Sequence, residues 1–351
     1  MFHLAIAGTG AMARYHVKKF SGIRDCTVSA VKDHVATHAE SFAREFSIPR
    51  WYDSLSRLIQ ENTAEAVSIA VVDWRHAELC SEALNAGLPV FCEKPMTRTL
   101  KEAQMLASLA QRTNVPTYVN FSKRGAPALH AMKSVLSRGL LGKLESVSAS
   151  YRQGWVVTGA WGDWRVEPRW AWRIHPSYST AGVVGDLGSH MVDALLFLFS
   201  DLSVTTCTRA VDMSEAVSSG LITAPGEFLE GNRVWLDMEA QCTVQKEVPC
   251  RLHLSLIDRE ALDDVAITVN GSEGTATLDL RRSRTSVEIL ERDGSVRQIM
   301  GPAILSTYEH FVSLASSRGN DVDFDSPVPD FTHGLRVQSI LDTLAPGGLP
   351  I

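Results

Sequence analysis

The chain has 351 residues, which is enough for two domains, since a domain usually holds about 100–200 residues. Hydrophobic residues make up 45% of the chain and charged residues 21%, so it can bury substantial cores and is not a largely disordered chain. The formal net charge is −6 and lysines and arginines do not cluster, which argues against a nucleic-acid partner because phosphate binding needs a basic surface.

Features of membrane proteins and exported proteins are weak in this sequence. No apolar run is long enough to span a bilayer, so we expect no membrane partner. Residues 1–13 contain an apolar stretch but lack a basic start, so we interpret them as a strand and a loop rather than a signal peptide. The six cysteines form no CxxC pair and lie mostly in apolar surroundings, which predicts reduced thiols in a cytoplasmic protein.

The first third of the chain alternates between strand and helix patterns. Short apolar runs predict strands at residues 2–7, 26–31, 66–72, 89–92 and 117–121. Apolar residues at helical spacing between these runs predict helices near residues 13–20, 39–46, 76–86 and 99–112. Strands that are separated by helices imply a parallel sheet with helices on both faces.

Beyond about residue 122 the pattern changes. Helices are predicted at residues 127–138, 186–199, 303–317 and 329–344, and strands at 144–151, 233–244, 251–257, 265–269, 275–280 and 286–290. Asn270-Gly271 predicts a turn, although the loop can extend to Gly274. We therefore predict a domain of residues 1–122 followed by an α+β domain of residues 123–351 with a largely antiparallel sheet. The final helices are candidates for packing back on the first domain.

A glycine-rich loop follows the first predicted strand. The pattern is GxGxxA, with Gly8 for the tight turn, Gly10 for close approach of a pyrophosphate, and Ala13 for packing of the helix on the strand. The helix N-terminus adds N–H groups that favour phosphate. Asp33 lies 20 positions after Ala13, where a carboxylate accepts hydrogen bonds from the adenosine ribose hydroxyls and favours NAD over NADP, without excluding NADP. The alternative is that Asp33 is only a turn residue.

A charged pair and a proline end the strand near residue 92, in the sequence Glu93-Lys94-Pro95. Ligands bind at the carboxyl ends of strands in a parallel α/β sheet, so Lys94 is expected where a nicotinamide ring would lie. The bond between Lys94 and Pro95 is a candidate for the cis form, because X–Pro bonds adopt it far more readily than others. The alternative is a solvated ion pair and a simple strand stop.

A third pattern lies at the start of the helix predicted at 186–199. Asp186, His190 and Asp193 are spaced i, i+4 and i+7, so they share one face of a helix. An acid one turn from a histidine can orient the imidazole and raise its basicity, which suits general acid–base catalysis. Two alternatives stay open from the residues alone: a capping aspartate with a structural histidine, and a metal site.

In their order and separation these motifs resemble the glucose–fructose oxidoreductase / inositol dehydrogenase / rhizopine catabolism (Gfo/Idh/MocA) family. The resemblance spans nearly the whole chain and includes Arg124, Pro127 and Lys133 at the entry to the second domain. It implies an α/β fold, with an N-terminal Rossmann domain (a doubly wound parallel sheet) that binds NAD or NADP. The α+β domain that follows would have a large, mostly antiparallel open sheet that covers the nicotinamide, binds substrate and forms homodimers or homotetramers.

The resemblance also implies roles for individual residues. Lys94 matches the catalytic lysine that assists the reacting hydroxyl, and Asp186 with His190 matches an acid–imidazole pair in which His190 accepts the proton. No metal ligand is implied. The cofactor contacts that it implies are Gly8, Thr9, Gly10, Ala11, Met12, Asp33, Val71, His76, Glu93 and Lys94. Val71 and Val72 depart from the family's usual Thr-Pro pair, which puts the carried-over contacts at this wall of the site in doubt.

The substrate is expected to be a sugar, a cyclitol or a related polyol. Five of the eight tryptophans lie between residues 155 and 172, and flat aromatic faces suit a sugar ring. A packed loop or a subunit contact is an equal alternative for this segment. The predicted substrate contacts are Lys94, Arg124, Arg173, Tyr178 and His190.

The motifs together predict an enzyme that transfers a hydride between NAD(P) and a secondary alcohol or ketone. Two functions from other classes remain as alternatives. One is a sensor or regulator that binds a dinucleotide without catalysis, against which the presence of Lys94, Asp186 and His190 argues. The other is a metal-dependent lyase or hydrolase that uses Asp186, His190 and Asp193, which the glycine loop disfavours.

Overall fold

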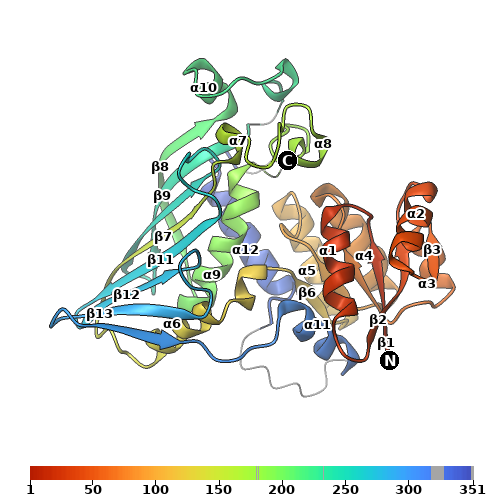
Figure 1. Cartoon of the computed structure of the whole chain (residues 1–351), viewed down its shortest axis with the longest axis horizontal. Coiled ribbons are helices and arrows are strands. Elements are labelled where there is room, and N and C mark those ends of the chain that lie inside the picture. The colour runs from red at the N-terminus through yellow and green to blue at the C-terminus, as the bar shows by residue number, and fades with distance from the viewer. Residues whose placement is uncertain (179, 181, 232, 318–327, 349–351) are drawn as a thin grey trace. The chain divides into compact units, whose positions relative to one another are not determined.

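The computed structural model describes residues 1–178, 180, 182–231, 233–317 and 328–348. It divides into two compact units. The first unit holds Met1–Phe121 with Leu305–Gln338, and the second holds Ser122–Ile304 with Ser339–Ile351. Each unit contains one sheet (Figure 1).

The first unit is built on a six-stranded parallel sheet with the strand order β3-β2-β1-β4-β5-β6. This order is that of a doubly wound dinucleotide-binding fold, so the predicted α/β class is confirmed. Most of these strands are buried on both faces, which is why they appear in the sequence as continuous apolar runs. The strands are β1 (Phe2–Ala7), β2 (Cys26–Lys32), β3 (Arg50–Tyr52), β4 (Ala66–Ile69), β5 (Val90–Cys92) and β6 (Thr117–Val119).

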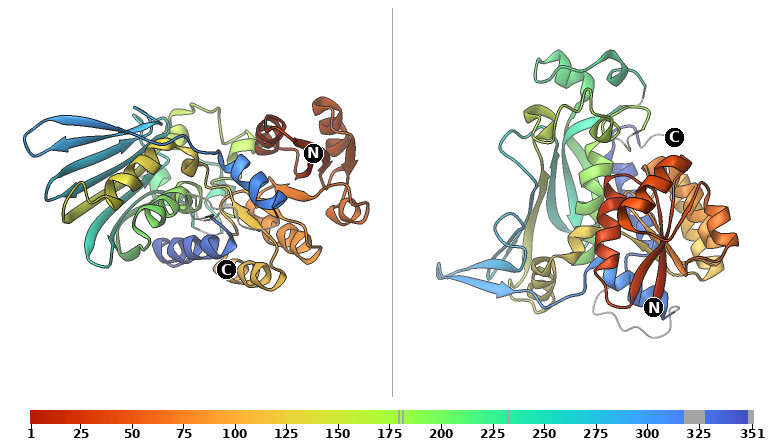
Figure 2. Two further views of the ribbon diagram at one scale, coloured as in Figure 1. Left: turned by 90° about the horizontal axis from the view of Figure 1, so that it is seen from below. Right: turned by 45° about the vertical axis from the view of Figure 1, so that its right-hand side comes forward.

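Helices lie on both faces of this sheet, with α1 on the opposite face from α4 and α5 (Figures 1 and 2). The start of α5 has the predicted capping box, in which Thr99 and Glu102 each accept a hydrogen bond from the other's backbone N–H. The elements are α1 (Ala11–Ser21), α2 (Ala36–Phe46), α3 (Leu55–Gln60), η1 (Asp73–Arg75), α4 (His76–Asn85), α5 (Leu100–Thr113) and α11 (Thr307–Ser316). The C-terminal helix α12 (Phe331–Leu344) begins in this unit and ends in the second.

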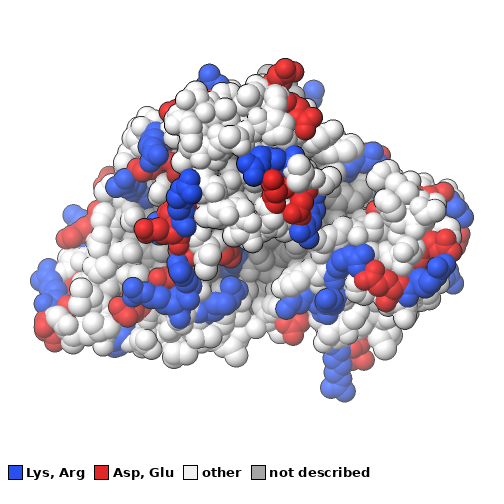
Figure 3. Space-filling view, turned by 45° about the horizontal axis from the view of Figure 1, so that its top comes forward, with Lys and Arg blue, Asp and Glu red and all other residues white. Residues whose placement is uncertain are grey.

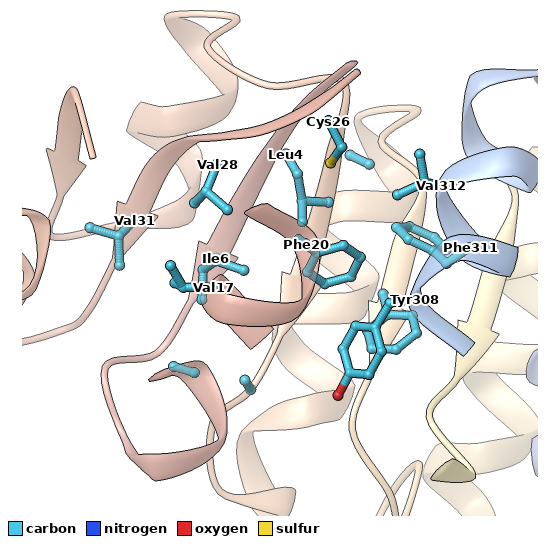
Figure 4. Packing of buried hydrophobic residues seen from close by; sticks show 14 of the residues in the cluster. Leu4, Ile6, Val17, Phe20, Cys26, Val28, Val31, Tyr308, Phe311 and Val312 are labelled. Carbon is cyan, nitrogen blue, oxygen red and sulfur yellow. The ribbon is translucent and has the colours of Figure 1, made fainter. Parts of the chain in front are cut away.

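An aromatic cluster ties the late helix α11 to the first unit. Phe20 of α1, Phe91 of β5, and Tyr308 and Phe311 of α11 have ring centroids 5.0–6.3 Å apart (Figure 4). All four rings are buried. Fully burying such a side chain stabilises a fold by about 1.5–3 kcal/mol, so this cluster holds α11 against the N-terminal sheet.

The second unit is built on an eight-stranded sheet with the order β14-β13-β12-β11-β7-β10-β9-β8. All neighbouring strands are antiparallel except β7 and β10, so the predicted largely antiparallel sheet is confirmed. The predicted turn lies at residues 272 and 273, which is the longer of the two expected loops. The strands are β7 (Leu144–Arg152), β8 (Ser203–Asp212), β9 (Trp235–Val244), β10 (Val248–Ser255), β11 (Asp264–Gly271), β12 (Gly274–Asp279), β13 (Ser286–Glu291) and β14 (Val296–Met300).

Helices α6 and α9 lie along one face of the eight-stranded sheet (Figures 1 and 2). The predicted helix at 186–199 is two elements: a π-helical turn holds Asp186, and α9 begins only at Ser189. Apart from α6 and α9, the helical elements of this unit are short. The helical elements are η2 (Ser122–Gly125), α6 (Pro127–Ser137), α7 (Trp155–Thr158), α8 (Pro168–Ala171), η3 (Val184–Gly188), α9 (Ser189–Phe199), α10 (Met213–Ser218) and η4 (Gly226–Phe228).

Two further sequence expectations concern the whole chain. All six cysteines are free thiols, and only Cys207 is not buried, as predicted. None of the described helices combines the length and the apolar character that a bilayer crossing requires.

Candidate active site

The glycine loop lies between β1 and α1 in the first unit. Gly8 has φ +110°, and a Cβ there would come within 2.4 Å of the Ala70 carbonyl oxygen, so only glycine fits. At Gly10, the N-cap of α1, no described atom lies within 4 Å of the position that a Cβ would occupy. Gly10, Ala11 and Met12 are exposed. The loop therefore leaves backbone N–H groups open to an anionic group, as a bound pyrophosphate requires.

Asp33 follows β2 and is held in place from two sides. Its Oδ2 accepts a hydrogen bond from the Thr9 hydroxyl at 2.7 Å, and its Oδ1 accepts one from the Val35 N–H at 3.0 Å. The His34 ring lies 3.1 Å from Oδ1. Thr9 thus links the phosphate loop to the carboxylate that we expect to bind ribose. These residues fit a dinucleotide of the NAD type.

Lys94 lies directly after β5, at the carboxyl edge of the parallel sheet, where the sequence places it. The Lys94–Pro95 bond is cis, as expected. Helix α12 supports the residues that follow, because a Cβ on Gly334 would meet the Met96 sulfur at 2.5 Å. Lys94 is half-buried. The structure therefore places an ammonium group at the edge of the sheet where α/β proteins bind ligands.

Glu93 is held by other residues of the first unit, and its contact with the cofactor stays a prediction. It is buried, and its Oε1 lies 2.8 Å from His16 Nε2 and accepts a hydrogen bond from Asn120 at 2.6 Å. Its Oε2 accepts from the Lys94 backbone N–H at 3.2 Å. Burial raises the pKa of Glu93, but the His16 and Asn120 hydrogen bonds and the Lys94 charge outweigh it and lower the pKa below 4.5. Asn120 also donates to the Tyr308 hydroxyl, which joins this network to α11.

His76 is likewise held by other residues of the first unit. Its side chain is buried, and its two ring nitrogens lie 2.9 Å from the Pro95 carbonyl oxygen and 3.2 Å from the Val71 carbonyl oxygen. Carbonyl oxygens only accept hydrogen bonds, so a protonated ring serves both. Burial opposes that charge, but contacts with Cys92, Asp73 and Pro95 outweigh it and raise the pKa of His76 to about 9. The expectation that His76 and Glu93 touch the cofactor is not favoured by these contacts.

In the second unit, Asp186 and His190 lie at the junction of η3 and α9. Asp186 accepts a hydrogen bond from the Arg173 guanidinium at 2.8 Å, so a predicted catalytic acid and a predicted substrate contact form an ion pair. His190 is buried, and its ring centroid lies 6.1 Å from that of Tyr151. Tyr178 is exposed and packs against His175, and its contact with substrate stays a prediction.

Sequence reasoning missed a polar group beside His190 that is centred on Asp263. The Asp263 Oδ1 accepts from the Tyr151 hydroxyl at 2.6 Å and from the Gln153 amide at 2.7 Å, and Oδ2 lies 3.1 Å from the Lys123 ammonium. Burial raises the pKa of Asp263, but the Lys123 charge and the hydrogen bonds from Tyr151 and Gln153 outweigh burial, so the pKa is lowered. Lys123 also lies over the Tyr151 ring and lines a small cavity with His190. No spacing in the sequence pointed to Asp263.

Arg124, whose contact with substrate stays a prediction, is buried in an ion pair. Its guanidinium forms a bidentate ion pair with Asp193, with Nε and Nη2 both donating at 2.7–3.0 Å, and it lies over the Phe197 ring. Both side chains are buried. Within the described part of the chain, no three His, Cys, Asp or Glu residues form a group that could hold a metal ion.

The tryptophan-rich segment is partly core. Trp155 and Trp164 are buried, and Trp164 donates a hydrogen bond to the Val156 carbonyl oxygen. Trp161 stacks on Trp155 and contacts Trp170, with centroids 5.1 and 5.2 Å apart. Trp164 therefore serves packing. For Trp161 and Trp170 both predicted roles stay open, namely contact with a sugar ring and packing in a loop or a subunit contact.

The fold and the glycine loop define a protein with a dinucleotide-binding domain joined to an α+β domain. Family models assign both parts. The model described as "Oxidoreductase family, NAD-binding Rossmann fold" matches residues 2–121, and the "GFO/IDH/MocA C-terminal domain" matches residues 129–277. The chain belongs to the Gfo/Idh/MocA oxidoreductase family.

Curated relatives are distant in sequence. A glucose-6-phosphate 3-dehydrogenase of Bacillus subtilis is 28% identical over 210 residues, which cover 60% of this chain and 57% of that protein. A D-apiose dehydrogenase of Paraburkholderia graminis is 26% identical over 305 residues, or 87% of this chain and 74% of that protein. The chain thus spans little more than half of the first of these relatives.

Solved structures share the fold over the whole chain. A levoglucosan dehydrogenase in complex with NADH and levoglucosan superposes with a TM-score of 0.79 at 19% identity, covering 98% of this chain and 96% of that one. An inositol dehydrogenase homologue of Azotobacter vinelandii in complex with NAD+ gives 0.78 at 16% identity, covering 99% and 96%. At these identities the likeness supports the architecture of both units.

Proposed function

We propose that this protein is an NAD-dependent oxidoreductase that interconverts a secondary alcohol and a ketone on a sugar, a cyclitol or a related polyol. The observation that carries the proposal is the position of Lys94. It follows β5 at the carboxyl edge of a sheet whose glycine loop and Asp33 fit a dinucleotide. The relatives named for glucose 6-phosphate, D-apiose and levoglucosan support a carbohydrate substrate.

The first unit would hold the cofactor through the exposed backbone around Gly10 and through Asp33. Gly8 keeps the loop close to β4, and Thr9 fixes the Asp33 carboxylate for the ribose hydroxyls. A carboxylate repels a 2′-phosphate, which favours NAD over NADP. When bound, the nicotinamide supplies the acceptor for the hydride, and the protein has to orient the substrate and move its proton.

Proton transfer falls to Lys94 and His190 in this proposal. The Lys94 ammonium donates a hydrogen bond to the reacting oxygen and stabilises negative charge that develops on it. His190 accepts the hydroxyl proton. Asp186 is held by its ion pair with Arg173 and sets the electrostatic surroundings of the His190 imidazole. The glutamate and histidine that support the first unit, Glu93 and His76, hold the loop that carries Lys94.

Three wider assignments remain predictions of the sequence. Residues 1–122 are assigned to the cofactor and residues 123–351 to substrate and to oligomer formation. A homodimer or homotetramer through the eight-stranded sheet would give that sheet's open face a partner. A cytoplasmic location follows from the use of cysteine.

The test is NADH formation, followed by absorbance, with NAD and a panel of sugars and cyclitols. Lys94→Ala should lower kcat/KM by about 10²–10⁴-fold, the usual size of a general acid–base contribution, while calorimetry shows NAD binding retained. Lys101→Ala on the exposed side of α5 is the matched control and should leave turnover unchanged. Unchanged turnover in Lys94→Ala would contradict the assignment. Absence of NADH with every substrate, with NAD still bound, would favour the sensor or regulator instead.

A further inference from the structure

The cations around His190 in the second unit are paired with carboxylates. Lys123 lies 3.1 Å from Asp263, and Arg173 lies 2.8 Å from Asp186. Deeper in the unit, Arg124 of η2 lies 2.7 Å from Asp193, which is on the same helix as His190. Each of these three cations of the second unit therefore has a carboxylate in contact with it.

The same balance extends through the aromatic segment. Residues 151–178 contain four arginines and no lysine. Each arginine lies within 2.8 Å of a carboxylate oxygen, in the pairs Arg152–Asp258, Arg165–Asp163, Arg169–Glu167 and Arg173–Asp186. On the face drawn in Figure 3, basic and acidic side chains are likewise interspersed. This part of the chain thus offers paired rather than surplus positive charge.

Charge balance of this kind selects against an anionic ligand. A phosphate or carboxylate group is held in proteins by charge-assisted hydrogen bonds from Arg or Lys. Near His190 such a group would have to compete with Asp186 or Asp263 for its cation. The displaced carboxylate would then lie next to a second negative charge, and this repulsion opposes binding.

Uncharged hydroxyl groups suit the same surroundings. The Asp263 side chain is 53% exposed, so its carboxylate can accept further hydrogen bonds from a ligand. Tyr151 and Gln153 fix that carboxylate from behind. A hydroxyl group can donate to it without disturbing the ion pair to Lys123.

On the basis of the proposed function, we infer that the substrate is an uncharged sugar or cyclitol, and that the Lys123–Asp263 pair discriminates against phosphorylated and carboxylated sugars. The pair determines specificity because the Lys123 ammonium is already neutralised by the Asp263 carboxylate. Neither residue needs to take part in the proton transfer assigned to Lys94 and His190.

The experiment compares related substrates with and without one anionic group. NADH formation is measured with D-glucose, D-glucose 6-phosphate and D-glucuronate, and with myo-inositol and its monophosphates, together with uncharged members of the panel that give turnover. We expect kcat/KM to be at least about tenfold higher for the uncharged member of each active set, which corresponds to about 1.4 kcal/mol. A higher kcat/KM for a phosphorylated or carboxylated member would overturn the inference and point to a cation outside these pairs.

A variant tests the named pair directly. Asp263→Asn leaves the Lys123 ammonium without its carboxylate, so the ratio of kcat/KM for uncharged over phosphorylated substrate should fall about tenfold. Glu167→Gln, which releases the exposed Arg169 instead, is the matched control and should leave the ratio unchanged. An unchanged ratio in Asp263→Asn would overturn the role of the pair. Absence of turnover with every sugar contradicts the proposed function itself and removes the inference with it.

Discussion

The regions around Lys94 and around His190 are built in different ways. Lys94 belongs to a contiguous motif at the end of a strand, and its neighbours Glu93 and Pro95 are anchored by buried residues of the first unit. The polar group beside His190 is assembled from residues far apart in the chain, such as Tyr151 and Asp263, which are 112 positions apart. A local motif is visible in one sequence, whereas a group joined only by folding is not.

The largest expected effect tests the scaffold of the His190 region. Arg124→Met leaves the buried Asp193 carboxylate without its bidentate partner, which typically costs 3–5 kcal/mol of unfolding free energy, so about that loss is expected. Urea or thermal unfolding measures it. The double variant Arg124→Met with Asp193→Leu should recover most of the loss, because no charge is then stranded.

The same double variant separates structure from substrate binding. If Arg124 serves the scaffold, the refolded double variant keeps its KM for the sugar within a few-fold of the original. A KM that rises strongly while the protein stays folded would restore Arg124 as a substrate contact.

The second prediction concerns the cofactor side of the first unit. Asp33→Ser removes the carboxylate that opposes a 2′-phosphate and accepts from ribose. The preference for NAD over NADP, taken as the ratio of kcat/KM values, should fall by about ten- to a hundredfold, the equivalent of roughly 1.5–3 kcal/mol for a charged hydrogen bond. Asp53→Ser, at an exposed ion pair of the same unit, is the control and should leave the ratio unchanged. A ratio that stays fixed in Asp33→Ser would remove Asp33 from cofactor selection.

The third prediction concerns Glu93 and carries a pH dependence. In Glu93→Gln, the amide NH2 group replaces one carboxylate oxygen and cannot accept a hydrogen bond. Either the Lys94 N–H or the His16 ring then loses its partner, which should lower the unfolding free energy by about 1–3 kcal/mol. The folded pKa of Glu93 is depressed below 4.5, so its contribution is present above that pH and is lost as the pH falls through the folded pKa. Unfolding measured from pH 3 to pH 7 should therefore show a shallower acid loss in Glu93→Gln.

Glu78→Gln is the control for this pH series, since Glu78 is exposed on α4. It should follow the original protein at every pH. An acid loss of stability that is the same in Glu93→Gln and in the original protein would contradict the depressed pKa assigned to Glu93.

The smallest effect is expected at Thr9. Thr9→Val removes the hydroxyl that donates to Asp33 at 2.7 Å, which should loosen the carboxylate and lower the NAD preference only a few-fold, or about 0.5–1.5 kcal/mol. Thr9→Ser keeps the donor and should keep the preference. Equal behaviour of the valine and serine variants would show that this hydrogen bond does not position Asp33.

Much of the fold followed from the sequence because its pattern is local. Continuous apolar strands and the glycine loop indicated the parallel sheet, and alternating strands with turn residues indicated the second sheet. The short edge strand Arg50–Tyr52 and the polar strand Ser203–Asp212 were missed, since neither has a clear apolar pattern. Helix α11 lies in the first unit, as expected for the final helices, but its particular contacts, such as that of Tyr308 with Phe20, are visible only in the folded chain.

The residues of the candidate site also divide into those that a local pattern predicts and those that only the folded chain brings together. Lys94, Asp33 and the glycine loop lie where their spacing indicated, since each is fixed by the strand that precedes it. The sequence pattern did not reveal that Asp186 lies in a π-helical turn before α9, or that Asp193 forms an ion pair with Arg124. Charge pairs between distant residues depend on the folded backbone, and a single sequence does not reveal them.

The proposed function requires Lys94 and His190 to act on the same substrate. The most direct test is a double-mutant cycle on kcat/KM with Lys94→Ala, His190→Ala and the double variant, measured by NADH formation. Residues that act as one unit give strongly non-additive losses, so the double variant should be hardly slower than the worse single variant. Losses that multiply, leaving each residue to act independently, would contradict the account.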